Sequence, residues 1–196
     1  LVGVSEELRA PIDNITVNMS NITSTKVSGL SNDLDAKVSN AGITISDSKA
    51  ELINGFVNIH NKLADSQNVS QELTNLSCSQ FYGFASSFSG KADKVTLNIN
   101  DVSSDKSSVG FAGSILAGSI TNTSLDIAKL RSKNAVSGFA QEVSKSELTN
   151  VRLNAKNIAS DDIAFGFVDA ISATTIDNLA VKIESLLGAS TQMVGT

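Results

Sequence analysis

Apolar and polar residues alternate over short stretches of this chain, and these stretches return at regular distances. Val151, Leu153 and Ala155 form one of them, with polar residues at the positions between. A period of two over five residues indicates a strand with one buried face. The same alternation occurs at Ile15, Val17 and Met19, at Val95, Leu97 and Ile99, and at Leu179, Val181 and Ile183. Each stretch predicts one strand of a repeated unit that holds two or three short strands joined by polar corners.

A glycine followed by a bulky apolar residue marks each copy of the unit. Successive glycines are 26, 26, 28, 27, 28 and 28 residues apart, a period typical of solenoids and other repeat arrays. The copies begin near Gly3, Gly29, Gly55, Gly83, Gly110, Gly138 and Gly166. We therefore expect residues 1–196 to form a single repeat domain, and we expect it to be a fragment of a longer solenoid.

Most copies also carry an apolar residue, any residue and then asparagine, about ten positions after the glycine. An asparagine at a tight corner bonds to turn backbone and tolerates left-handed dihedral angles, and stacked asparagines can bond to each other. The pairs are Ile12 and Asn14, Val38 and Asn40, Ile120 and Asn122, Leu148 and Asn150, and Ile176 and Asn178. In the fourth copy Lys94 replaces the asparagine. Because a buried lysine is costly, we expect an exposed corner or a bulge there.

Two all-β or mixed architectures fit this spacing. The first is a single-stranded parallel β-solenoid, a right-handed β-helix of about seven coils with 26–28 residues each, the hand following from the usual chirality of parallel crossovers. The alternative is a leucine-rich-repeat-like solenoid, in which the segment from Gly83 to Gly90 would be helical. We favour the β-solenoid, because that segment carries glycine and serine, which are poor helix residues.

The fifth copy, GFAGSILAGSITNTS from Gly110 to Ser124, resembles the GLUG motif of bacterial and protist surface proteins. The matching positions are Gly110, Phe111, Ala112, Gly113, Gly118, Ile120 and Asn122. The resemblance covers nearly the whole chain at the level of its period and its Gly/Ile/Asn skeleton. It implies a right-handed parallel β-helix segment of a large adhesin-like protein, and it supplies no catalytic residues.

Composition excludes several classes of function. The net charge of −5 and the scattered lysines and arginines lack the basic footprint of nucleic-acid binding, and they disfavour an anionic membrane surface. No stretch approaches the roughly 18 apolar residues of a membrane span, so we expect no membrane insertion in this segment. The single cysteine, Cys78, allows no internal disulfide or cysteine zinc site, and we expect no cofactor.

Six N-x-S/T sequons occur, at Asn14, Asn18, Asn21, Asn68, Asn75 and Asn122. Asn18 lies between the inward residues Val17 and Met19, so its side chain should point outward. If a eukaryote secretes the chain, we expect Asn18, Asn21 and Asn75 to be the N-glycosylation sites, since Asn14 and Asn122 belong to the corner column.

Candidate catalytic groups are few. His60, the only histidine, falls where other copies carry Leu8, Leu34 and Phe88. We expect a one-residue slip to place Ile59 inward and His60 at the rim of an irregular third coil. Glycosidase chemistry needs two acids a few ångströms apart, and no adjacent copies pair acids in the two outward columns that we compared. Asp161 and Asp162 form a corner pair, which we expect to be solvated.

These observations favour a non-enzymatic structural or interaction module, serving as a β-solenoid stalk or adhesin scaffold of a larger surface or extracellular protein. Its partner would be a protein or glycan surface, or flanking repeats of the same chain. One alternative is an assembly subunit that stacks end to end in a filament or docks in a large complex, including an intracellular one. The other alternative, which the lack of paired acids in adjacent copies disfavours, is a carbohydrate-active β-helix enzyme domain.

Overall fold

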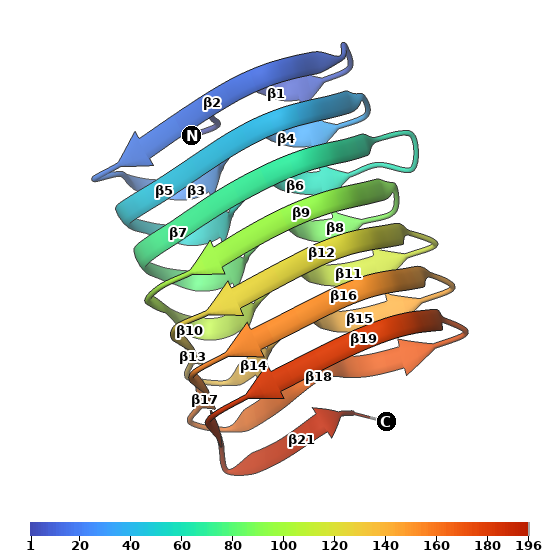
Figure 1. The fold of residues 1–196 in the computed structure, drawn as a ribbon. Helices are drawn as coiled ribbons and strands as arrows, with labels where there is room; N and C mark the ends of the chain where they lie inside the picture. Colours follow the sequence, from blue (N-terminus) through green and yellow to red (C-terminus); the bar gives the residue numbers. More distant parts are fainter. Residues whose placement is uncertain (196) are drawn as a thin grey trace.

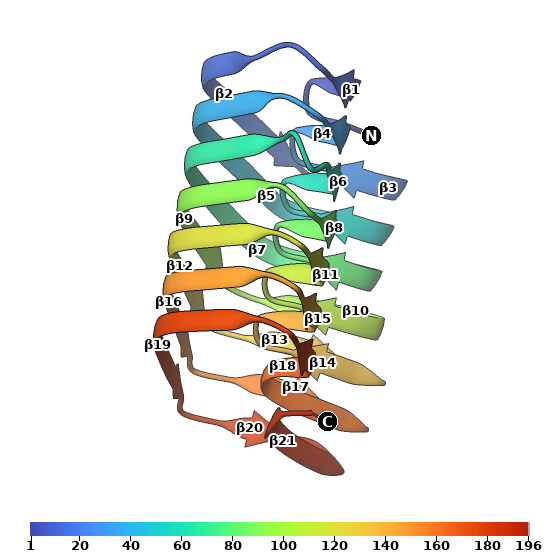
Figure 2. The same cartoon turned by 90° about the vertical axis from the view of Figure 1, so that its right-hand side faces the viewer.

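The computed structural model describes residues 1–195 and contains only strands in that range, joined by short corners. All strand pairs are parallel, and each strand of an inner coil pairs with its equivalent one coil before and one coil after, as Leu125 pairs with Leu97 and Leu153. The coils stack along one axis from blue to red in Figures 1 and 2 and wind in a right-handed sense. The β-solenoid is thus confirmed. The leucine-rich alternative is wrong, because Ala85–Phe88 is a strand, β8, where that architecture needs a helix.

Each coil has three faces. We name them A, B and C in the order in which the chain runs along them, in β2, β3 and β4. Face A is the front layer of Figure 1. It holds β2 (Ile12–Ser20), the first half of β5 (Lys37–Asn54), the first half of β7 (Asp65–Tyr82), β9 (Lys91–Ile99), β12 (Ser119–Ile127), β16 (Glu147–Ala155) and β19 (Thr175–Ile183).

Faces B and C complete the coil. Face B holds β3 (Thr23–Ser28), the second halves of β5 and β7, β10 (Val102–Val109), β13 (Leu130–Ser132), β14 (Ala135–Ser137), β17 (Ile158–Ser160), the start of β18 (Ile163–Ser172), β20 (Leu186–Leu187) and β21 (Ser190–Val194). Face C holds β1 (Ser5–Leu8), β4 (Ser31–Leu34), β6 (Val57–His60), β8, β11 (Ala112–Leu116), β15 (Ala140–Ser144) and the end of β18.

One apolar core runs through the stack, because each inward residue packs on the residue at the equivalent position of the next coil. The clearest column is a phenylalanine ladder. Its ring centroids are 4.7 Å apart from Phe56 to Phe84 and from Phe84 to Phe111, 5.2 Å from Phe111 to Phe139 and 5.0 Å from Phe139 to Phe167. The rings are stacked and fully or almost fully buried, so each Gly-Phe copy of the dipeptide packs its aromatic ring against that of a neighbouring copy.

The glycine before each phenylalanine is required by contact between coils and not by its dihedral angles, since no glycine has a positive φ. A Cβ on Gly83 would overlap the backbone carbonyl oxygen of Gly110 and would lie 2.9 Å from Leu97 Cδ2. The same overlap with the next glycine recurs at Gly29, Gly55 and Gly110. The dipeptide is therefore the place where the backbones of consecutive coils approach most closely.

The asparagine column forms a hydrogen-bonded ladder at the start of face A. Its residues have positive φ, for example 54° at Asn150, and the Nδ2 of Asn150 donates to Oδ1 of Asn122 at 3.0 Å. Lys94 keeps the same conformation, with φ 55°, and is exposed. The register continues on both sides of Lys94, so the exposed corner is confirmed and no bulge forms.

The third coil is in register with its neighbours, contrary to the slip predicted from its sequence. His60 pairs with Leu34 on one side and Phe88 on the other, and its side chain is fully buried in the core. Ile59 is only half-buried. The prediction that His60 lies at the rim is wrong, because moving it outward would require the whole of β6 to leave the register that its two neighbours share.

Candidate functional site

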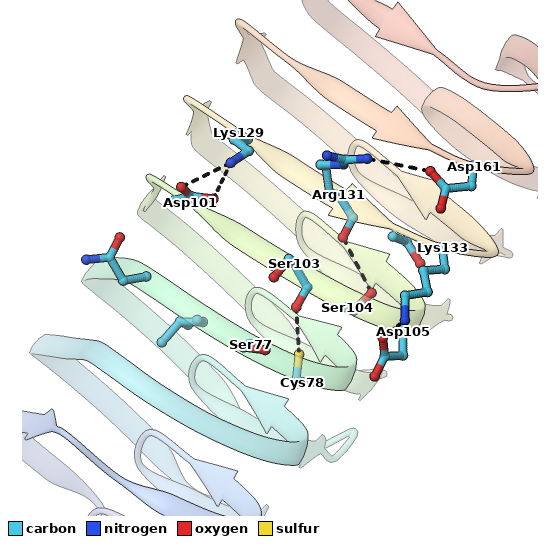
Figure 3. A pocket seen from close by; sticks show the side chains of 13 residues that line it. Ser77, Cys78, Asp101, Ser103, Ser104, Asp105, Lys129, Arg131, Lys133 and Asp161 are labelled. Carbon is cyan, nitrogen blue, oxygen red and sulfur yellow. Dashed lines mark hydrogen bonds and ion pairs between the residues drawn. The ribbon is translucent and has the colours of Figure 1, made fainter.

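An open trough of about 630 Å³ on face B crosses the third to sixth coils (Figure 3). We call it the charged trough. It is lined by Asn75, Leu76, Ser77, Cys78, Asp101, Ser103, Ser104, Asp105, Lys129, Arg131, Ser132, Lys133 and Asp161. The side chains come from the second half of β7, from β10 and β13, and from the corners beside them.

The alternation of inward and outward side chains along each strand determines where the charged groups of the trough lie. Lys129, Arg131 and Lys133 are two residues apart on the fifth coil, so all three side chains leave the same side of the strand. The fourth coil presents Asp101, Ser103 and Asp105 at the equivalent positions, since Ser103 pairs with Arg131. A row of cations therefore lies directly beside a row that carries two carboxylates.

Three ion pairs join neighbouring coils across the trough. Lys129 Nζ lies 2.9 Å from Asp101 Oδ1, and Lys133 Nζ lies 2.6 Å from Asp105 Oδ1. The Arg131 guanidinium reaches the opposite way, to Asp161, at 3.5 Å. All six side chains are about half exposed or more, so each pair contributes little to stability. Their charges balance, and the trough offers hydrogen-bond donors and acceptors in alternation.

Ionisation of the trough carboxylate Asp105 is reinforced by Lys133. A hydrogen bond from the ammonium group, together with its charge, lowers the pKa of Asp105 and raises the pKa of Lys133. A general acid would instead need a carboxyl pKa raised toward neutrality. Asp105 is therefore suited to holding a cation or a hydrogen-bond donor, and not to giving up a proton.

Small side chains form the floor of the trough. Cys78, Ser104 and Ser132 are at most 6% exposed, and the Cys78 thiol lies 3.9 Å from the carbonyl oxygen of Ser103. The Oγ of Ser132 has no hydrogen-bond partner within residues 1–195. Burial, with a smaller contribution from the charge of Asp105, raises the pKa of Cys78 to about 12, so the thiol stays protonated at neutral pH.

We expect native Cys78 to resist thiol reagents. A pKa of about 12, against an ordinary value of roughly 8.5, lowers the thiolate fraction at pH 8 by about 10³-fold. The measurement is the reaction of the folded protein with an aromatic disulfide, followed by absorbance, beside the same protein in urea. Equal rates in the two samples would show that the thiol is not buried.

The three asparagines predicted as glycosylation sites are all exposed. Asn18 lies on the outer side of β2, as expected. Asn21 and Asn75 lie at the corner between faces A and B with positive φ, and the Nδ2 of Asn75 donates to Asp47 Oδ1 at 2.9 Å. Asn75 also borders the trough, so the structure brings one of the three to the cleft and leaves the other two apart from it.

The remaining candidate residues do not converge on a catalytic centre. Asp162 and Asp161 are exposed at their corner, as predicted. His60 lies in the core, away from any carboxylate. Within residues 1–195 no three His, Cys, Asp or Glu side chains are grouped closely enough to hold a metal ion, and no helix is suited to crossing a bilayer.

The charged trough was not predicted, although the repeat contained a signal for it. Aligning the copies on the corner column, Lys94 with Asn122, places Asp101 beside Lys129 and Asp105 beside Lys133, one coil apart. Opposite charges in the same outward column of adjacent copies are neighbours in a solenoid.

Comparison with family models, with curated proteins and with solved structures found no match to this chain.

Proposed function

We propose that this chain is a non-enzymatic structural and interaction module, a β-solenoid stalk or adhesin scaffold of a larger surface or extracellular protein. The observation that supports this most directly is that the repeated residues act between coils. Glycine allows the backbones to approach, phenylalanine stacks in the core, and asparagine bonds along the ladder. The residues that recur in most copies therefore build a rod, and many of the residues that differ between copies lie on its outer surface.

The charged trough is the contact surface of this module. It extends over four coils, and two of its carboxylates are held by lysines of the neighbouring coil. Balanced charges and a floor of small polar residues suit a polar, uncharged partner surface such as a neutral glycan. The likeness of the fifth copy to the GLUG motif points in the same direction, toward a surface protein.

Antibody labelling of intact cells tests the location. Antibodies raised against the folded domain should label intact cells of the producing organism as strongly as permeabilised ones. A binding assay on immobilised neutral glycans and matrix proteins should detect retention that Arg131→Ala weakens and Arg152→Ala, on the outer side of face A, does not. Labelling that requires permeabilisation, or release of reducing sugar from a polysaccharide panel, would contradict the proposal.

A second candidate function, the end-to-end assembly subunit, is favoured by the polarity of the asparagine ladder. In five ladder bonds the amide of the later coil donates to an oxygen of the coil before it, from Asn40 to Asp13 through Asn178 to Asn150. The two ends of the rod are thereby complementary. Asn178 presents its Oδ1 at one end, and Asn14 of a second copy could donate to it.

The outer strands at the two ends also have a free edge. Strand β2 pairs only with β5, and β19 pairs only with β16. The apolar columns continue to both ends, where Ile176 is 40% exposed. One steric conflict exists. Val2 pairs with Ser28 at one end of the rod, Gln192 pairs with Phe165 at the other end, and both belong to the same column. When two copies stack, Val2 of one copy and Gln192 of the other would fall at the same position.

Sedimentation velocity over a concentration series tests this second candidate. Removal of residues 1–4 should promote association of the chain, because it clears the disputed place. Ile176→Lys in the shortened chain should abolish association by placing a charge on the end face. A shortened chain that stays monomeric at high concentration would exclude end-to-end stacking.

A further inference from the structure

Polar residues replace apolar ones at three inward positions of the third coil. Three inward positions that are apolar in the coils before and after carry His60, Ser66 and Gln71, and all three side chains are fully buried. Their column neighbours are Leu34 and Phe88, Val38 and Ala92, and Ile43 and Leu97. These three polar residues therefore lie in one slice of the core, between apolar residues of the same columns.

Hydrogen bonds satisfy this slice only in part. The Nε2 of His60 lies 2.9 Å from Ser66 Oγ, and the Nε2 of Gln71 donates to the carbonyl oxygen of Gly83 over 3.4 Å. His60 Nδ1 and Gln71 Oε1 have no partner within the described residues. Buried polar atoms without partners destabilise the folded state, so the core is locally weakened at this slice.

The imidazole of His60 lies among uncharged groups. Its ring stacks on Phe88 at a centroid distance of 4.3 Å and lies 5.9 Å from the ring of Phe84. The charged residues of the packed elements are Asp33 of β4, Asp65 and Glu72 of β7, Lys91 of β9 and Lys62 of the corner. They belong to the outer surface, where Asp33 accepts from Asn61 and Asp65 from Gln67. No carboxylate is available to stabilise an imidazolium.

A loop adjoins the same slice. His60 ends β6, and residues 61–64 form the corner to β7, seen at the right of Figure 1. It is the longest of the corners that join face C to face A, and Leu63 at its tip is 77% exposed. Water could reach the ring by displacement of this short segment, without separation of the coils on either side.

We propose that the third coil is an acid-sensitive joint of the rod, in which proton uptake by His60 opens the β6–β7 corner while the later coils stay stacked. The Nδ1 nitrogen takes a proton from water, and the imidazolium is then stable only when it is hydrated. Coils of a solenoid contact only their neighbours, so an opening at this slice separates the first two coils from the last four.

The pKa of His60 sets the pH range. Burial lowers it from 6.5 to about 3, and backbone groups of His60 and Asn61 offset this only in part. A histidine whose pKa is depressed in the folded state contributes stability above pH 6.5, and this is lost as the pH falls toward 3. The opening constant should rise up to about tenfold for each pH unit across that range.

Hydrogen exchange followed by mass spectrometry, corrected for intrinsic exchange rates, tests the proposal. Between pH 7 and pH 4.5, peptides covering residues 57–73 should lose protection by at least about tenfold, whereas peptides covering 119–160 keep theirs. The control is His60→Leu, which places the residue of the preceding coil in the slice. It should make protection of 57–73 independent of pH.

His60→Phe, which extends the column from Phe88, serves as a second control if the leucine variant does not fold. The proposal is overturned if the variants lose protection with pH as the wild type does. It is also overturned if protection falls uniformly along the chain or falls first at the end coils. These outcomes concern the joint alone and leave the scaffold function standing.

Discussion

Leu153→Asp should unfold several coils of the rod at neutral pH. Leu153 is fully buried on β16, between Leu125 of the coil before and Val181 of the coil after. Removal of a buried leucine side chain costs about 2–5 kcal/mol, and the aspartate adds an unpaired buried charge. The sum approaches or exceeds the roughly 5–15 kcal/mol that stabilises a typical domain.

Urea unfolding followed by circular dichroism measures this effect. The control is Arg152→Asp, at the neighbouring exposed position of the same strand, which should change the free energy of unfolding by less than about 0.5 kcal/mol. If the Leu153→Asp variant keeps the wild-type midpoint, the assignment of this column to the core is wrong. An intermediate outcome, in which only part of the strand signal is lost, would show that only some of the coils unfold.

The period and the alternation were sufficient to predict the architecture. Glycine spacing set the length of each coil, and the alternating apolar residues identified the inward columns. Both depend on contacts that every copy repeats, so seven weak signals reinforce each other. The left-handed conformation of the asparagine column was predictable for the same reason, since a corner residue must tolerate it in each coil.

His60 shows why residue preferences misled at a single position. A lone histidine suggested a rim position, because polar side chains seldom lie in apolar cores. The hydrogen bonds of β6 to both β4 and β8 outweigh that preference, since a slip would displace every other side chain of the strand as well. Packing of whole strands decides such cases, and a single copy of the repeat does not contain that information.

The charged trough illustrates a different limit. Asp101 and Lys129 are 28 residues apart, and neither belongs to a recognised motif. Their contact follows from the register between coils, and the depth of the cleft follows from the small side chains of its floor. The contact could be predicted from aligned copies once the solenoid was assumed, whereas the depth of the cleft depends on the path of the backbone.

Gly110→Ala should destabilise the rod although alanine is ordinarily the better residue. At a position that alanine can occupy, such a replacement stabilises a protein by about 0.4–1 kcal/mol through the unfolded state. At Gly110 the new Cβ would overlap the carbonyl oxygen of Gly138, and it would lie 3.2 Å from Ile127 Cδ1. Backbone cannot withdraw as a flexible side chain can, so we expect a loss of about 1–3 kcal/mol.

The matched control is Gly42→Ala on face A. A Cβ at Gly42 meets nothing closer than Thr16 Oγ1, at 3.8 Å, so this variant should be as stable as the wild type or slightly more so. Thermal unfolding of both variants decides the matter. Equal melting temperatures would show that the repeated glycine is a remnant of duplication, whereas opposite shifts would show that close approach of consecutive coils maintains it in each copy.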